Sequence, residues 1–254
     1  MITIRDYQRP ATLAEAWKLN QKKANRILGG MGWMKMSHNA IGTAIDLSGL
    51  GLDQIQETET EFVVGAMVTL RQMETHTALN AYFHGAPRES VRHIVGVQFR
   101  NCATVGGSVW LRPGFSDPLT LLLALDCTVE LCTGAETVEV PLEKFNEMPY
   151  DNSVLKAVHI QKNGRQVAYQ SFRNTETDFP VLTAAVSVKD GVYRAAVGAR
   201  PNRARRVEAP TVEELVEKAQ TTLSYGSNLR GSAEYRIALA QVLIKRAVAE
   251  LEGR

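Results

Sequence analysis

Residues 100–126 read RNCATVGGSVWLRPGFSDPLTLLLALD, and a second glycine-rich stretch, RILGGMGWMKM, lies upstream at residues 26–36. Each stretch carries a glycine pair, Gly106-Gly107 or Gly29-Gly30. A glycine pair lets the backbone adopt positive φ and approach a ligand closely, so that successive N–H groups can converge on an anion. Neither stretch matches the P-loop or the G-x-G-x-x-G dinucleotide fingerprint. The two stretches therefore predict two anion-accessible turns, with an ordinary tight turn as the alternative reading of each.

The composition is that of a globular protein with a sizeable core. The chain has 254 residues, of which 44% are hydrophobic, and its formal net charge is +2. No basic stripe interleaves with aromatic residues, so nucleic acid is not expected as a partner. The longest apolar runs are too short to span a bilayer, and the opening MITIRDYQRP lacks the apolar segment of a signal peptide. We therefore expect a soluble, cytoplasmic protein without a membrane span.

Cysteine and histidine spacing offers no metal site on this chain. Cys102, Cys127 and Cys132 form neither an even disulfide framework nor a C-x-x-C pair, and we expect small buried side chains in a reducing compartment. The histidines show no paired spacing such as H-E-x-x-H. Any iron–sulfur cluster in the same system is therefore expected on another chain. The basic run RPNRARR, residues 200–206, is expected to be a solvated loop.

Local signals place helices and strands along the first half of the chain. Thr12 with Glu15, and Thr69 with Gln72, form capping boxes that predict helices over about residues 12–22 and 70–79. Short apolar runs predict strands, the spacing of Val91, Ile94 and Val95 predicts one further helix, and a longer apolar run is expected to form another. The strands are RILGG (26–30), AIDLSGL (44–50), FVVGA (62–66) and CTVELCT (127–133), and the helices are ESVRHIVGV (89–97) and LTLLLALD (119–126).

The last part of the chain reads as strands followed by helices. VLKAVHI (154–160) and QVAYQSF (166–172) are extended, and Asp190-Gly191 joins two apolar runs over 180–199 into a hairpin. Thr211 with Glu214 caps a helix, and an amphipathic helix over about 232–251 closes the chain. This order indicates an α+β fold, with a boundary near residue 165.

Read as R-N-x-A-T-x-G-G-S followed by Asp117-Pro118 and an apolar run, the 100–126 stretch resembles the FAD-binding (medium) subunit of the molybdenum hydroxylases, the xanthine dehydrogenase and carbon monoxide dehydrogenase family. FVVGAMVTL (62–70), DFPVLTAAVSV (178–188) and GSAEYRIALAQVLIKRAV (231–248) are similar to that family in the same order. The resemblance implies an FAD-binding domain over residues 1–165 built from two small α/β subdomains. It implies a C-terminal α+β domain, an antiparallel sheet with helices, over 166–254.

The resemblance also implies which residues contact FAD. Backbone N–H groups of the first loop would hold the pyrophosphate, and the second loop would contact the ribityl, phosphate or adenosine portion, with Ile94 against the adenine. Asp117 matches the flavin-contacting aspartate, although it could equally be a helix N-cap. Leu155 matches a leucine near the flavin ring, and an inward-facing strand leucine is its ordinary alternative. The full set is Ile27, Leu28, Gly29, Gly30, Met31, Gly32, Trp33, Ile94, Thr104, Gly106, Gly107, Ser108, Leu111, Asp117 and Leu155.

The chain departs from the family pattern at three places. The first loop usually reads A-G-G-T-D-L, whereas Met31, Gly32 and Trp33 stand here in place of the threonine, the acidic residue and the leucine. Ser108 stands where asparagine is usual, and Arg173 is the only cation near the position of a lysine in F-x-K. Backbone donation survives such changes, but side-chain anchoring of the cofactor does not.

The function implied by the resemblance is that of an oxidoreductase subunit. Substrate would be oxidised on a molybdopterin-binding large subunit, and electrons would cross two-iron, two-sulfur clusters on a small subunit. Noncovalent FAD on this chain would pass them to NAD or another acceptor. Two alternatives remain open: a cofactor-depleted assembly or scaffold subunit, and a free-standing flavoprotein oxidase.

Overall fold

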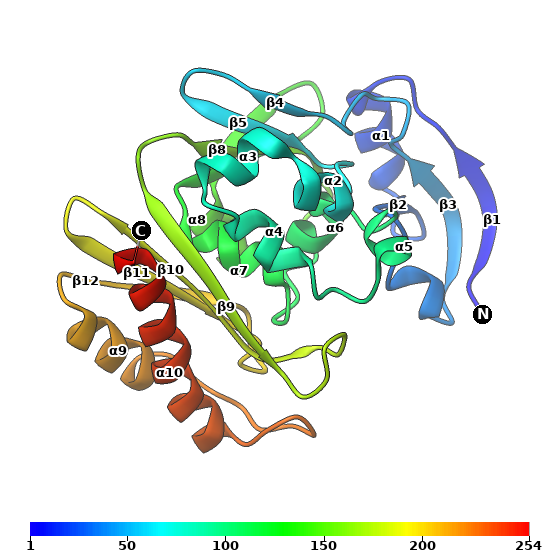
Figure 1. Cartoon of the computed structure of the whole chain (residues 1–254). Helices are drawn as coiled ribbons and strands as arrows, with labels where there is room; N and C mark the ends of the chain where they lie inside the picture. Colours follow the sequence, from blue (N-terminus) through cyan, green and yellow to red (C-terminus); the bar gives the residue numbers. More distant parts are fainter. Residues whose placement is uncertain (254) are drawn as a thin grey trace.

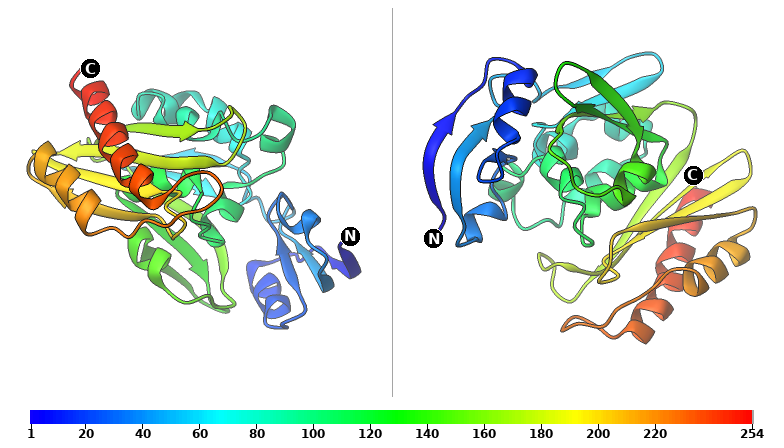
Figure 2. Two further views of the ribbon diagram at one scale, coloured as in Figure 1. Left: turned by 90° about the horizontal axis from the view of Figure 1, so that it is seen from below. Right: turned by 180° about the vertical axis from the view of Figure 1, so that it is seen from behind.

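The computed structural model describes residues 1–253, which form three sheets with helices packed on them (Figure 1). The N-terminal unit is a parallel three-stranded sheet in the order β1-β3-β2, accompanied by α1 and the short 3₁₀ helix η1. This unit lies at one end of the molecule, apart from the C-terminal helices (Figure 2). Its elements are β1 (Thr3–Gln8), α1 (Leu13–Asn20), β2 (Arg26–Leu28), η1 (Met34–Met36) and β3 (Ala40–Asp46).

The middle unit is an antiparallel five-stranded sheet in the order β4-β5-β8-β6-β7, with a group of short helices on one side. Its strands are β4 (Ile55–Glu57), β5 (Glu61–Gly65), β6 (Cys127–Cys132), β7 (Thr137–Pro141) and β8 (Val154–Gln161). Its helices are α2 (Leu70–Thr75), α3 (Thr77–Tyr82), α4 (Ala86–Val91), α5 (Val97–Arg100), α6 (Val105–Trp110), α7 (Asp117–Ala124) and α8 (Leu142–Glu147).

The C-terminal unit is an antiparallel four-stranded sheet in the order β12-β11-β10-β9. Two helices pack on one face of this sheet, and α7 of the middle unit packs on the other face (Figure 1). Strand β10 is therefore buried on both sides, which explains its almost uninterrupted apolar sequence. The elements are β9 (Gln166–Arg173), β10 (Pro180–Lys189), β11 (Val192–Gly198), β12 (Arg205–Ala209), α9 (Val212–Thr221) and α10 (Ala233–Glu252).

Helix α7 is buried at every one of its residues, Asp117 to Ala124. A helix that is apolar all round must be enclosed by other elements, and its leucines share one core with the middle sheet and with Tyr169 and Ala185 of the C-terminal sheet. The core of the middle unit thus continues across residue 165 into the C-terminal sheet. The domain division at residue 165 stays a prediction.

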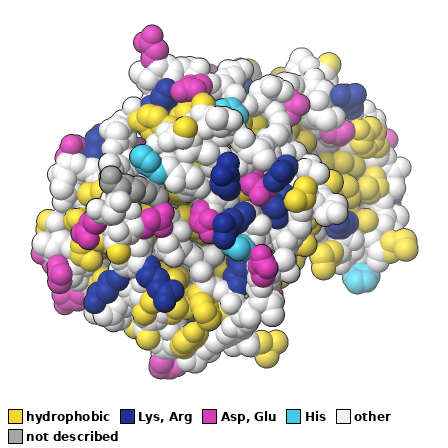
Figure 3. Space-filling model, in the orientation of Figure 1, with side chains coloured by type: hydrophobic (Ala, Val, Ile, Leu, Met, Phe, Trp, Pro, Cys, Tyr) yellow, Lys and Arg dark blue, Asp and Glu magenta, His cyan; other side chains and the backbone are white. Residues whose placement is uncertain are grey.

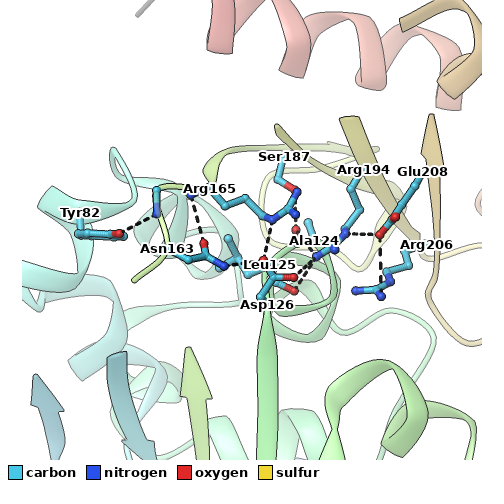
Figure 4. Close-up of polar contacts among 11 residues, drawn as sticks. Tyr82, Ala124, Leu125, Asp126, Asn163, Arg165, Ser187, Arg194, Arg206 and Glu208 are labelled. Carbon is cyan, nitrogen blue, oxygen red and sulfur yellow. Dashed lines mark hydrogen bonds and ion pairs between the residues drawn. The ribbon is translucent and has the colours of Figure 1, made fainter. Parts of the chain in front are cut away.

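A polar network holds the C-terminal sheet against the end of α7 (Figure 4). Arg194 of β11 donates to the carbonyls of Ala124 and Leu125 and to Asp126 Oδ1 at 2.9 Å, and Arg165 Nε donates to Asp126 Oδ2 at 2.9 Å. Burial opposes the ionisation of Asp126, but hydrogen bonds from Asn163, Arg165 and Arg194 outweigh it and hold the pKa of this carboxyl well below its usual range.

Most of the predicted elements are present. The Thr69–Gln72 capping box forms with both of its hydrogen bonds, and Asp190 and Gly191 both adopt positive φ in the hairpin between β10 and β11. The antiparallel C-terminal sheet with its two helices confirms the predicted α+β class. Surface charge is mixed, since Lys, Arg, Asp and Glu side chains are interspersed on the face shown in Figure 3.

Several local predictions were wrong. The strand placed at 44–50 is β3, which ends at Asp46, and the helix placed at 70–79 is interrupted at His76, whose ring caps α3. The helix placed at 12–22 ends at Asn20, and the one placed at 89–97 is the end of α4 followed by a turn and α5. Cys102 is exposed, whereas Cys127 and Cys132 are buried as expected.

The run 200–206 is only in part a solvated loop. Pro201 and Asn202 are exposed, but Arg200 is 1% exposed, with its guanidinium donating to three backbone carbonyls, and Ala204 is fully buried. Arg205 and Arg206 begin strand β12. Backbone carbonyls can satisfy a buried guanidinium as well as water does, and the charge pattern of a sequence does not show this.

The Asp126 network makes a prediction about stability. Asp126→Asn should lower the free energy of unfolding by about 1–2 kcal/mol at neutral pH, a value kept small because the carboxylate is partly exposed. The folded-state pKa of Asp126 is lowered, so its contribution is complete above its unfolded pKa of about 4 and declines progressively as the pH falls from that value toward the folded-state pKa. Urea unfolding of both proteins between about pH 3 and pH 7 measures this difference.

Glu147→Gln is the matched control, because Glu147 also pairs with an arginine of the C-terminal sheet, Arg205, but both side chains are exposed. Its effect should stay below about 1 kcal/mol. Equal losses in the two variants would contradict a special role for Asp126.

Candidate functional site

The first glycine loop connects β2 to η1 and presents unpaired backbone amides. Gly30 has φ +80° and Met31 has φ +57°. Within residues 1–253, the N–H groups of Gly30, Met31, Gly32 and Trp33 donate no hydrogen bond, and backbone pairing resumes with Lys35 N–H donating to Met31 O at 3.2 Å. Successive free amides in a turn of this kind can form a concave anion-binding cradle. Ile27 and Leu28 lie just before this cradle on β2.

The second glycine stretch packs directly against the first loop. Thr104 is the N-cap of α6; its hydroxyl donates to Gly29 O at 3.1 Å and accepts from Gly107 N at 3.0 Å. A Cβ on Gly30 would lie 1.8 Å from Cys102 O, and one on Gly107 would lie 2.9 Å from Gly29 O. The two stretches predicted to share a ligand are therefore in contact.

The expected reason for glycine in the second stretch was wrong. Gly106 and Gly107 lie in α6 and, unlike Gly30, are not among the positive-φ residues. Gly106 is required because a Cβ there would lie 2.5 Å from Ala66 O of the segment after β5. The constraint at 106 and 107 is close packing of backbone on backbone rather than left-handed conformation.

The amides of the second stretch are used within the protein. Val105 N donates to Val68 O, Gly106 N donates to Ala66 O, and Ser108 N donates to Thr104 O. The second stretch therefore positions the first loop and offers a ligand its small glycine surface rather than a row of donors. Anion binding by backbone amides is concentrated in the first loop.

Asp117 is the first residue of α7, and Ser116 is the N-cap, with its hydroxyl accepting from Leu119 N. The alternative reading of Asp117 as the N-cap was wrong. Its Oδ1 accepts hydrogen bonds from Tyr169 Oη at 2.6 Å and from Arg173 Nη2 at 2.5 Å. Burial raises the pKa of Asp117, and the Arg173 guanidinium offsets part of that rise. Both side-chain donors bond Oδ1, and the Asp117 backbone also bonds the carboxylate, so only Oδ2 is left without a side-chain partner.

Arg173 links Asp117 to the loop between β9 and β10. Its side chain is 7% exposed, and Nη1 donates to Asp178 O at 2.7 Å. Its Nε is buried and has no hydrogen-bond partner among the described residues. An orphaned buried donor is costly unless a ligand or water satisfies it. Asp178 in turn pairs with Arg230 at 2.8 Å.

A cavity of about 480 Å³ opens where the three units meet. Trp33 of the first loop, Phe115 before α7 and Phe179 of the β9–β10 loop supply its aromatic lining. The Trp33 ring centroid lies 5.2 Å from those of both Phe115 and Phe179. Polar lining comes from the C-terminal unit: Asn202, Arg203, Asn228 and Arg230. The size of the cavity and its mixture of aromatic and polar lining suit a planar ligand with polar edges.

The other residues predicted to contact FAD differ in how deeply they are buried. Leu111 is the exposed C-cap of α6, and its carbonyl accepts from Tyr150 Oη. Leu155 is buried on β8, adjacent to Lys156, whose carbonyl accepts from Ala66 N. Ile94 lies in the turn after α4, and its carbonyl accepts from Arg100. Within residues 1–253, no hydrogen bond joins Ile94 to the glycine turns at 29–33 or 104–108.

Sequence reasoning missed several residues of this site. Tyr169, Phe115 and Phe179 were not singled out, and Arg173 was noted only as a substitute for a lysine. Phe115, two positions before Asp117, and Phe179, directly after Asp178, could be noticed in the sequence. Their contact with each other depends on the tertiary structure, which the sequence pattern does not show. Among the described residues, no group of three or more His, Cys, Asp or Glu side chains is arranged to hold a metal ion, and no helix there is long and apolar enough to cross a membrane.

Comparison with known proteins shows which families this chain matches. Residues 2–162 match the family described as the FAD binding domain in molybdopterin dehydrogenase, and residues 167–251 match the CO dehydrogenase flavoprotein C-terminal domain. The nicotine 6-hydroxylase medium subunit of Paenarthrobacter nicotinovorans is 28% identical over 280 residues, covering 98% of this chain and 97% of that subunit. The carbon monoxide dehydrogenase medium chain of Afipia carboxidovorans is 26% identical over 285 residues, with coverage of 98% and 97%.

A solved structure shares the fold. A chain of the Cu,Mo-CO dehydrogenase in its cyanide-inactivated form matches with a TM-score of 0.87 at 24% identity, covering 98% of both chains. The residues present fit FAD. Free amides at 30–33 suit a pyrophosphate, while Asp117 Oδ2 and the orphaned Arg173 Nε suit the polar edge of a flavin ring.

The first loop makes a prediction about cofactor affinity. Gly30→Ala should weaken FAD binding by about tenfold or more, because it combines strained positive φ with a Cβ that overlaps Cys102 O. Isothermal titration of the deflavinated chain with FAD measures the change.

Gly164→Ala is the control, since Gly164 has φ +78° and a Cβ added there would meet nothing within 4 Å. It should lower stability by about 1 kcal/mol while leaving FAD affinity unchanged. Equal FAD affinity in both variants, with both folded, would show that the first loop does not form the cradle.

Proposed function

The chain belongs to the family of FAD binding domains of molybdopterin dehydrogenases, and from this membership we propose that it is the FAD-carrying electron-transfer subunit of a multisubunit molybdopterin-dependent dehydrogenase or hydroxylase. The observation that carries the proposal is the row of free amides at residues 30–33, held in place by Thr104. An electron-transfer subunit needs a tightly held cofactor and no acid, base or nucleophile of its own.

FAD, when bound, supplies the uptake and release of electrons. The residues of this chain bind and orient it noncovalently. The first-loop amides hold the pyrophosphate, and each hydrogen bond to a charged group contributes about 1.5–3 kcal/mol, so three or four amides suffice without a lysine. Asp117 and Arg173 fix the polar edge of the ring, and Tyr169 holds the Asp117 carboxylate in position. Leu155 and the second glycine stretch exclude water on the core side.

The partners follow from the relatives. These are named as a medium chain and a medium subunit, which are components of larger enzymes. We propose a molybdopterin-binding large subunit and an iron–sulfur small subunit as partners, with NAD or another molecule as the final acceptor, and the cytoplasm as the compartment. The substrate would be oxidised on the large subunit.

A cofactor-depleted scaffold subunit is the second candidate. The specific observation behind it is that Met31 and Gly32 provide neither a hydroxyl nor a carboxylate beside the cradle. Trp33 adds an aromatic ring that stacks on Phe179 and lies tilted against Phe115 at the mouth of the site. Flavin content separates the two candidates.

The first test is release of the cofactor. Heat or acid denaturation of the purified chain or its complex should release FAD into the supernatant, because the cofactor is held noncovalently. Chromatography of that supernatant distinguishes FAD from FMN. Release of FMN alone, or no flavin even after incubation with FAD, would favour the scaffold candidate.

The second test is assembly. Purification from the native source should yield this chain together with a large molybdopterin-containing chain and a small iron–sulfur chain, since obligate interfaces bury on the order of 2,000 Å² or more. Mass spectrometry and metal analysis of the purified complex identify the partners. A lone flavoprotein that oxidises an organic substrate at full rate without metal would instead indicate a free-standing oxidase.

A further inference from the structure

Trp33 is a large aromatic side chain with a free surface at the edge of the cradle. It is 43% exposed, although it lines the 480 Å³ cavity and contacts two phenylalanine rings. Its ring lies nearly parallel to that of Phe179, with an interplanar angle of 28°, and at 52° to that of Phe115. Phe115 and Phe179 also contact each other, at 4.8 Å between centroids. The indole is thus held in one orientation by residues from two other units.

The aromatic group is tied to both ends of the proposed flavin site. Trp33 is itself one of the residues with free amides, so its side chain begins at the end of the proposed pyrophosphate cradle. Phe115 lies two residues before Asp117 in the sequence. Phe179 follows Asp178, whose carbonyl accepts from the same Arg173 that binds Asp117. The aromatic group therefore adjoins residues of both the cradle and the Asp117–Arg173 pair.

We propose that the indole of Trp33 is the surface on which the isoalloxazine ring of FAD stacks, and that Phe115 and Phe179 hold the indole in place for it. This inference rests on the proposed function. The loop lacks the hydroxyl and the carboxylate that would anchor a cofactor through side chains, and an aromatic face supplies an anchor of another kind. Offset stacking between aromatic rings is favourable beyond the area it buries.

The neighbouring glycine supports this assignment. A Cβ at Gly32 would lie 2.8 Å from the Phe99 ring, so glycine lets the loop turn closely over Phe99 and direct the next residue outward. The electron acceptor is the alternative ligand for this cavity, because Arg203 and Arg230 in the lining could attract an anionic molecule. Arg230 is already neutralised by Asp178 and stacks over Phe179 at 4.9 Å, so its charge is committed to holding the aromatic group.

The test uses the full chain, deflavinated and titrated with FAD, in the wild type and in Trp33→Leu and Trp33→Phe. An indole in contact with a flavin quenches flavin emission by electron transfer. The bound flavin should therefore be weakly fluorescent in the wild type and several-fold brighter in Trp33→Leu, with FAD affinity reduced about 3- to 10-fold. Trp33→Phe should retain most of the affinity while losing most of the quenching, because a phenyl ring stacks but is a poor electron donor.

Trp110→Phe is the control, because Trp110 packs against Phe145 away from the cavity lining. It should change neither bound-flavin emission nor affinity. Equal emission and affinity in wild type and Trp33→Leu would overturn the inference while leaving the proposed function intact. Tighter binding in Trp33→Leu would also overturn it, by showing that the indole fills the place of the ring. Absence of FAD binding to the wild type in equilibrium dialysis would defeat the proposed function and the inference together.

Discussion

Helix α7 is buried along its whole length, and side chains from the C-terminal sheet hold both of its ends. At the first turn Asp117 accepts from Tyr169 and Arg173 of β9, and beyond the last turn Arg194 of β11 donates to the Ala124 and Leu125 carbonyls. Ser116 Oγ caps the free amides at the helix start, so at that end the sheet satisfies the buried Asp117 carboxylate, whereas at the other end it satisfies the free helix carbonyls themselves. The position of the C-terminal sheet is therefore fixed by the polar requirements of one apolar helix.

This arrangement connects the candidate site to the whole molecule. The N-terminal unit brings the free amides, the middle unit brings Thr104 and Asp117, and the C-terminal unit brings Arg173 and Phe179. Contact between the first two depends on backbone approaching backbone, because Cβ atoms at Gly30 or Gly107 would overlap carbonyl oxygens. A site assembled from three units in this way is sensitive to small shifts of any one of them, since a ligand that spans the units experiences every displacement.

The sequence was informative wherever a local rule determines the structure. The Thr69–Gln72 capping box, the Asp190-Gly191 turn and the continuous apolar run of α7 depend only on neighbours in the chain. The partners of Asp117 are far away in the sequence, at Tyr169 and Arg173, so no local pattern could assign them. Arg200 shows the same limit. Its burial depends on carbonyls that only the folded chain brings together.

The first loop departs from the family pattern in its side chains, whereas the anchoring of a cofactor by its backbone amides is kept. Replacing a threonine and an acidic residue by Met31 and Gly32 removes side-chain hydrogen bonds but leaves the amides, because their directions depend on backbone conformation and on packing against Thr104 and Cys102. Gly30 is therefore the more constrained position, while 31–33 can vary as long as the turn is kept. A substitution that adds an aromatic ring there can restore part of the lost anchoring through contact area, and Trp33 lies where such a ring would have to be.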